Sequence, residues 1–172
     1  MELNKILSEI EAEKVFGTRP QYGGNILTVC EVEDKPSKTG RPMLTLFLNN
    51  ESNYFSQYPL RYWLLYDDKG IGHFKRIFNV FFQSNPGIFS EKDLNSKVFN
   101  ERKFIGCKIG GILGEEKYIS DKSGKEISGF YVYNLITTEK IFNDQIQIPP
   151  VKEREYSSNT TKQPKNDEDL PF

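Results

Sequence analysis

The segment YPLRYWLLYDDKGIGHFKRIFNVFF, residues 58–82, changes its apolar period halfway along. The first part alternates between two faces, which predicts a strand over residues 58–66 with one face in the core. The core face carries Leu60, Tyr62, Leu64 and Tyr66, and the other face carries Arg61, Trp63 and Leu65. After the turn 67–70, apolar residues recur at i, i+3, i+4 and i+7, which predicts a helix over residues 71–82. This stripe consists of Phe74, Ile77, Phe78 and Phe81.

Segments rich in β-branched and alternating apolar residues lie on both sides of this strand–helix unit. We predict strands over 25–33 and 43–49 before it. After it we predict strands over 103–113, continuing at 117–120, and over 127–137. Gly106, Gly110 and Gly111 suggest bends or bulges in the fourth strand. Short helical segments are expected at 3–13, where apolar residues share one helical face, and near 90–94.

The predicted order is therefore three strands, a helix and two strands. A mainly β, five-stranded OB-fold barrel has this order, with its helix between the third and fourth strands, and such barrels commonly bind oligonucleotides along strands two and three. We assign residues 1–148 to this domain. From Pro149-Pro150 onward the chain has few apolar residues, so residues 149–172 are predicted to form a disordered tail.

Composition favours a binding protein over an enzyme. The 172 residues carry a net charge of −1 and include one histidine and two cysteines, Cys30 and Cys107, both in apolar runs that predict buried thiols. These residues form no metal-ligand pattern and no catalytic constellation, so no metal, cofactor or enzymatic activity is predicted. Without a secretory signal or a membrane-length apolar run, we expect a cytoplasmic protein with no membrane partner.

Aromatic and basic residues cluster in and around the second and third predicted strands. Single-stranded nucleic acid is held by bases stacking on aromatic rings, with cations alongside for the backbone. The sequence therefore offers a candidate DNA surface on two basic hairpin loops, one aromatic stretch and the last strand. Its residues are Lys35, Lys38, Arg41, Tyr54, Phe55, Tyr58, Arg61, Trp63, Lys122, Lys125, Tyr131 and Tyr133. For each aromatic ring the alternative is packing in the core. The choice between core and surface stays open for Phe55, Trp63, Tyr131 and Tyr133, whereas Tyr54 and Tyr58 favour the surface.

The final six residues combine three acids with an apolar tip: Asp167, Glu168, Asp169, Leu170, Pro171 and Phe172. Phe172 can enter a small apolar pocket while its carboxylate pairs with a basic side chain, and Pro171 lowers the entropy lost on docking. The acids attract a basic partner surface and raise the association rate. A solvated acidic stretch would need no such tip, so the segment is interpreted as a partner-binding motif.

This motif resembles the C-terminal tip of bacterial-type single-stranded DNA-binding proteins. The resemblance implies an OB domain, a disordered linker and a tip that docks replication, recombination and repair proteins. The body lacks the N-terminal strand signature and Gly- and Gln-rich linker of that family, so its homotetramer is not implied. The segment 35–44 is similar to the first hairpin of OB-fold single-stranded DNA-binding proteins encoded by bacteriophages, which would place the protein in a bacterial host cytoplasm.

The sequence thus predicts a non-catalytic binder of single-stranded DNA with little sequence preference. It leaves homo-oligomerisation open. It also leaves open a protein-binding replication adaptor, with an OB-like fold and the same tail but little affinity for DNA.

Overall fold

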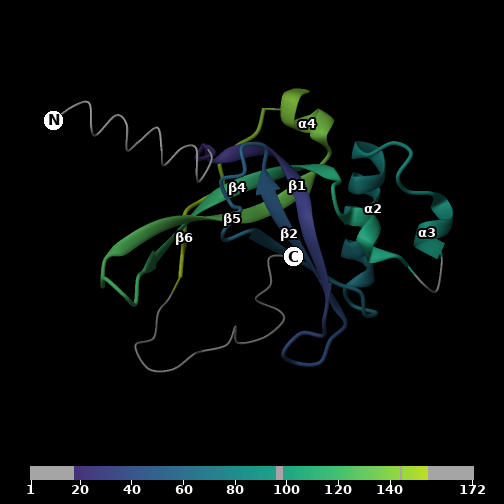
Figure 1. Ribbon diagram of the computed structural model, residues 1–172, viewed down its shortest axis with the longest axis horizontal. Helices are drawn as coiled ribbons and strands as arrows, with labels where there is room; N and C mark the ends of the chain where they lie inside the picture. Colours follow the sequence, from purple (N-terminus) through teal and green to yellow (C-terminus); the bar gives the residue numbers. More distant parts are fainter. Residues whose placement is uncertain (1–17, 96–98, 144, 155–172) are drawn as a thin grey trace.

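The computed structural model describes residues 18–95, 99–143 and 145–154. Figure 1 shows a mainly β architecture with the helices outside the sheet. The elements in order are β1 (Gly23–Asp34), β2 (Met43–Asn50), β3 (Leu60–Leu65), α2 (Ile71–Ser84), α3 (Glu91–Asn95), the 3-10 helix η1 (Glu101–Phe104), β4 (Lys108–Ile119), β5 (Glu126–Ile136), α4 (Thr138–Asn143) and β6 (Lys152–Glu153). None of the helices in these ranges is long and apolar enough to span a membrane.

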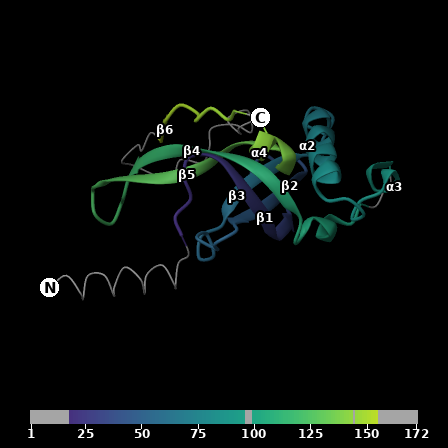
Figure 2. The same cartoon turned by 90° about the horizontal axis from the view of Figure 1, so that it is seen from above.

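The antiparallel strands follow the order β3-β2-β1-β4-β5 and form a strongly curled sheet, which Figures 1 and 2 show as a half barrel. The long strand β1 pairs with β4 through Gly23–Thr28 and with β2 through Leu27–Asp34. Its register with β2 shifts between Val29 and Glu31. A bulge of this kind bends and twists its strand, and here it turns β1 from one partner to the other. The curl brings β3 into contact with β5.

The core lies inside this curl and is closed by α2. Alternate residues of β1, β2 and β3 point inward, including Leu27, Leu46 and Tyr62, all 1% exposed or less. The predicted helix and its stripe are confirmed, since Phe74, Ile77, Phe78 and Phe81 are the buried residues of α2. Tyr66 is the exception on the predicted core face of β3: it follows the strand, is exposed, and donates a hydrogen bond to Asp34 Oδ1 at 2.7 Å.

The turn between β3 and α2 is held by Asp67. Its Oδ1 accepts the backbone N–H of Gly70 at 2.8 Å, and its carboxylate also binds the Arg41 guanidinium. Gly70 comes very close to the end of β3, because a Cβ at this position would lie 2.5 Å from the Leu65 carbonyl oxygen. The change from strand to helix therefore requires both the aspartate and the glycine.

The start of β4 differs from the prediction of a strand over 103–113. Residues 101–104 form η1, with Phe104 fully buried, and β4 begins at Lys108 after Gly106, which adopts φ +86°. Gly110 and Gly111 form no bulge. They permit close packing, since Cβ atoms there would lie 2.6 Å from Ile141 and 2.3 Å from Leu27. Cys30 is also not buried as predicted, because it occupies the bulge in β1 and is exposed.

The segment 145–154 lies against the sheet, which corrects the predicted tail boundary at residue 149. Pro149 is buried, the Tyr131 hydroxyl donates to the Pro150 carbonyl at 3.0 Å, and β6 pairs in parallel with β4. Arg154 makes two hydrogen bonds to the largely buried Glu116, at 3.1 and 2.9 Å. These contacts compensate for the low apolar content of the segment. The predicted helix at 3–13 and the tail residues 155–172 lie outside the described residues.

We expect removal of residues 149–172 to lower the free energy of unfolding by about 1–3 kcal/mol, because Glu116 then loses its hydrogen-bonded partner in a largely buried position. Removal of residues 155–172 should leave stability within about 0.5 kcal/mol of the full chain. Urea unfolding followed by circular dichroism compares the two truncations. Equal stability of both would show that the segment 149–154 contributes nothing to the fold.

Candidate nucleic-acid interface

The loop between β2 and β3, residues 51–59, is held by two buried asparagines at the end of β2. Asn49 Oδ1 accepts the backbone N–H of Phe55 at 2.9 Å, and Asn50 Oδ1 accepts that of Tyr54 at 2.7 Å. The Asn50 amide also donates to the Thr18 carbonyl at 3.2 Å. Because these bonds fix the backbone N–H groups of two consecutive aromatic residues, the loop presents the rings of Tyr54 and Phe55 in a defined arrangement.

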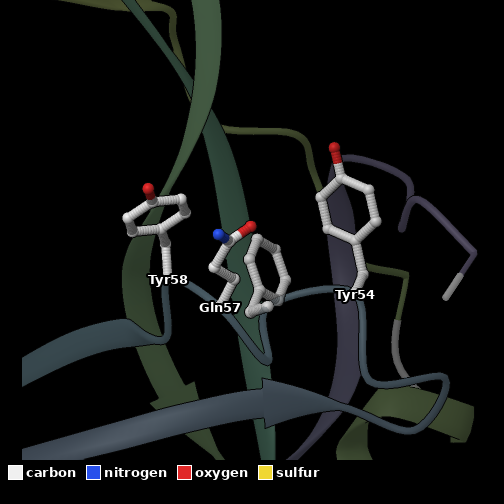
Figure 3. Close-up of a pocket in the computed structure, with 4 residues that line it drawn as sticks. Tyr54, Gln57 and Tyr58 are labelled. Carbon is white, nitrogen blue, oxygen red and sulfur yellow. The ribbon is translucent and has the colours of Figure 1, made fainter. Parts of the chain in front are cut away.

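Four loop residues, Tyr54, Phe55, Gln57 and Tyr58, line a surface pocket of about 210 Å³, which we call the tyrosine pocket. Figure 3 shows the Tyr54 and Tyr58 rings rising on the same side of the loop, with the Gln57 side chain between them. Phe55 is 7% exposed and packs in the core, whereas Tyr58 is 78% exposed. The predicted surface position of Tyr58 is therefore confirmed, and Phe55, for which core and surface were both open, is buried.

An aromatic cluster supports the pocket from β5 and from the chain before β1. Phe130 lies edge-to-face against Phe55 at 5.4 Å and against Tyr54 at 6.2 Å between ring centroids. Tyr22 contacts Phe130 at 4.9 Å, and the Arg19 guanidinium lies 4.8 Å over the Phe130 ring. Sequence reasoning missed Arg19, Tyr22 and Phe130. The available signal was an Arg and a Tyr within a Gly- and Pro-rich loop, and a Phe beside the two tyrosines that were chosen.

The outward face of the β2–β3 pair carries a second group, Phe47, Arg61 and Trp63, which we call the β2–β3 outer face. Arg61 is exposed and its guanidinium lies 5.6 Å over the Phe47 ring, while Trp63 is partly exposed. Arg61 forms no ion pair with any described residue, so its charge remains available for a phosphate. Arg61 follows Tyr58 by three residues in the chain, and β3 begins between them at Leu60.

Acidic residues border the β2–β3 outer face on the β1 side. Glu31 pairs with Phe47 and Glu33 with Thr45, and both carboxylates are exposed. Directly paired residues of antiparallel strands project from the same face of a sheet. A polyanion on this surface would therefore run along β3, near Arg61, and avoid β1.

The predicted basic hairpin tip lies at the opposite end of the β1–β2 ladder from the tyrosine pocket. The paired length from Leu44 to Asn50 separates the two ends by about 20 Å. Lys35 and Lys38 are exposed there and form no ion pair among the described residues. Arg41 is committed to Asp67, with bonds of 2.6 and 3.0 Å, and these lower the pKa of the Asp67 carboxyl to about 2. Arg41 thus stabilises the β3–α2 turn through Asp67. Its position in a basic loop of the sequence did not indicate this structural role.

The remaining predicted residues lie on the β4–β5 hairpin and do not join the tyrosine pocket. Lys122 and Lys125 are exposed at the hairpin tip, which extends away from α2 in Figures 1 and 2. Tyr131 is next to Phe130 on β5 and therefore projects from the other face, where the Lys152 amine lies 5.5 Å over its ring. Tyr133 is 52% exposed at the bulge in β5.

The six candidate partner-binding residues, 167–172, lie outside the described residues. Within the described ranges, no three His, Cys, Asp or Glu side chains are grouped so that they could hold a metal ion. No protein-family model matches this chain, and neither does any curated protein.

We expect Asn49→Ala to destabilise the protein by about 1–3 kcal/mol, because the buried N–H of Phe55 loses its acceptor. Chemical unfolding measures this loss. The control is Asn79→Ala, which replaces an exposed asparagine on α2. Asn53→Ala is unsuitable as a control, because Asn53 adopts φ +59°, a backbone conformation that alanine disfavours. A stability equal to that of the Asn79 variant would mean that the Asn49 side chain does not hold the loop.

Proposed function

We propose that the protein binds single-stranded DNA with little sequence preference, protects it, and recruits replication, recombination or repair proteins through residues 167–172. The observation that carries the proposal is the juxtaposition of exposed aromatic rings and an unpaired cation along β3 and the loop before it. Tyr58 is 78% exposed, Arg61 lies over Phe47, and Trp63 is partly exposed on the same strand as Arg61. Rings that accept bases and cations beside them are the chemistry by which single strands are held.

The topology supports an OB-type barrel as the scaffold. The first strand pairs with both the second and the fourth, the third contacts the fifth, and α2 lies between β3 and β4 in the chain. OB barrels bind oligonucleotides on the face of strands two and three, which is where Phe47, Arg61 and Trp63 lie. Lys35 and Lys38, at the far end of the same strand pair, would meet the backbone of a longer strand.

The net charge of −1 does not oppose this proposal, because single strands respond to local charge. Glu31 and Glu33 repel the phosphates of a DNA strand from the β1 side of the β2–β3 outer face, and Arg61 lies on the β3 side, where the strand would run. Stacking supplies a term that salt does not screen. We therefore expect binding with only a modest dependence on salt concentration.

The test is fluorescence anisotropy with labelled oligo-dT and a matching duplex. We expect the full chain to bind the single strand more tightly than the duplex, and Tyr58→Ala to weaken that binding by about 5- to 100-fold, the equivalent of one stacked base. Phe142→Ala is the matched control, because Phe142 is 77% exposed on α4, away from the proposed path. Absence of binding at low salt, with or without residues 167–172, would reject the DNA function and favour the adaptor.

A salt series with the same oligonucleotide tests Arg61 separately. If Arg61 neutralises one phosphate, Arg61→Ala should reduce the slope of log affinity against log salt by about 0.7. Arg102→Ala removes an exposed arginine on η1 and should leave the slope unchanged. An unchanged slope in the Arg61 variant would remove this residue from the proposed contact surface.

A further inference from the structure

We propose that the tyrosine pocket holds one unpaired nucleobase of the bound strand and that the Gln57 amide reads the hydrogen-bonding edge of that base. This inference rests on the proposed function and adds to it a residue that distinguishes an unpaired base from a paired one. It starts from the side chains drawn in Figure 3, where the Gln57 amide and a further, unlabelled ring lie between the rings of Tyr58 and Tyr54.

The dimensions and lining of the pocket suit a single base. Its volume of about 210 Å³ is below the roughly 300–1,000 Å³ of pockets that enclose drug-sized ligands. All four lining residues are uncharged, so the pocket offers no ion pair to a phosphate. A flat, neutral, hydrogen-bonding group fits this environment, and in a nucleotide that group is the base.

The two tyrosines provide one fixed wall and one adaptable wall. Tyr54 is held edge-to-face against Phe55 at 5.1 Å and 88°, and Phe55 is held against Phe130 at 5.4 Å and 87°. Tyr58 makes no ring contact with a described residue. A base that enters can therefore stack on Tyr58 without displacing any ring of the core, while Tyr54 limits its position from the other side.

Gln57 supplies the polar element. Its side chain is exposed and forms no hydrogen bond with the described part of the chain, so the carbonyl oxygen and the amide nitrogen are both available. One accepts and the other donates, which matches the adjacent donor and acceptor on the Watson–Crick edge of a base. That edge is occupied in a duplex, so the same contact would favour unpaired DNA.

A phosphate next to the bound base would contact a cation that lies outside the pocket. Arg19 lies over Phe130, whose ring contacts Tyr54, and Arg61 follows Tyr58 by three residues. Arg19 therefore lies on the Tyr54 side of the pocket, and Arg61 lies on the strand that the loop leads into. This arrangement separates base recognition inside the pocket from backbone neutralisation beside it.

The experiment compares oligo-dT with the same oligonucleotide carrying N3-methylthymine, in which methylation blocks the base edge and leaves the ring to stack. We expect the full chain to bind the methylated strand about 3- to 10-fold more weakly, the effect of losing one or two hydrogen bonds at a partly solvated site. Gln57→Leu, which keeps a side chain of similar size, should bind both strands equally. Gln83→Ala, an exposed glutamine on α2, should keep the full discrimination.

The outcomes distinguish the pocket from the proposed function. If the chain binds both strands equally well, DNA binding stands and the reading of the base edge by Gln57 is wrong. If Gln57→Leu still discriminates, another residue reads the base and the inference is also wrong. If neither strand binds, the proposed function fails and the pocket has no strand to read. Thymidine monophosphate should compete only weakly, and competition as strong as that of the oligonucleotide would make the pocket a free-nucleotide site instead.

Discussion

The fold depends on one strand that pairs on both sides while it bends. β1 pairs with β4 through Gly23–Thr28 and with β2 through Leu27–Asp34, and the bulge at Cys30 follows shortly after the residues that pair with both. The curled sheet brings β3 into contact with β5. The buried residues of β1, Leu27 and Val29, lie at the change of partner, so the same short segment sets both the curvature and the centre of the core.

The curvature in turn creates the candidate site. The loop after β2 reaches β5 because the sheet curls, and this places Phe130 against Tyr54 and Phe55. Asn49 and Asn50 then hold the loop backbone, so that Tyr58 remains exposed beside a fixed ring. The ring of Phe55 thus contributes to the core, whereas the exposed ring of Tyr58 makes no ring contact with a described residue.

The segment 145–154 adds a second constraint on the β4–β5 hairpin. The parallel pairing of β6 and the Arg154–Glu116 bonds cover part of the edge of β4 beyond the end of β1. An uncovered edge strand offers unpaired backbone groups to other chains, so this segment protects the hairpin.

The sequence by itself determined the type and order of most elements, because strand and helix periods are local properties of the chain. The alternation of residues 60–65 and the stripe of α2 specify their own secondary structure, and Leu60, Tyr62 and Leu64 are buried as predicted, whereas Tyr66 is not. The sequence also identified Tyr58 as a surface ring, although it placed Tyr58 at the start of the third strand, whereas the structure places it in the loop before β3. Only the tertiary structure decided that Arg41 is bound by Asp67, that Lys35 and Lys38 lie far from the tyrosines, and that residues 149–154 dock on β4. These are contacts between residues distant in the chain, and no local period encodes them.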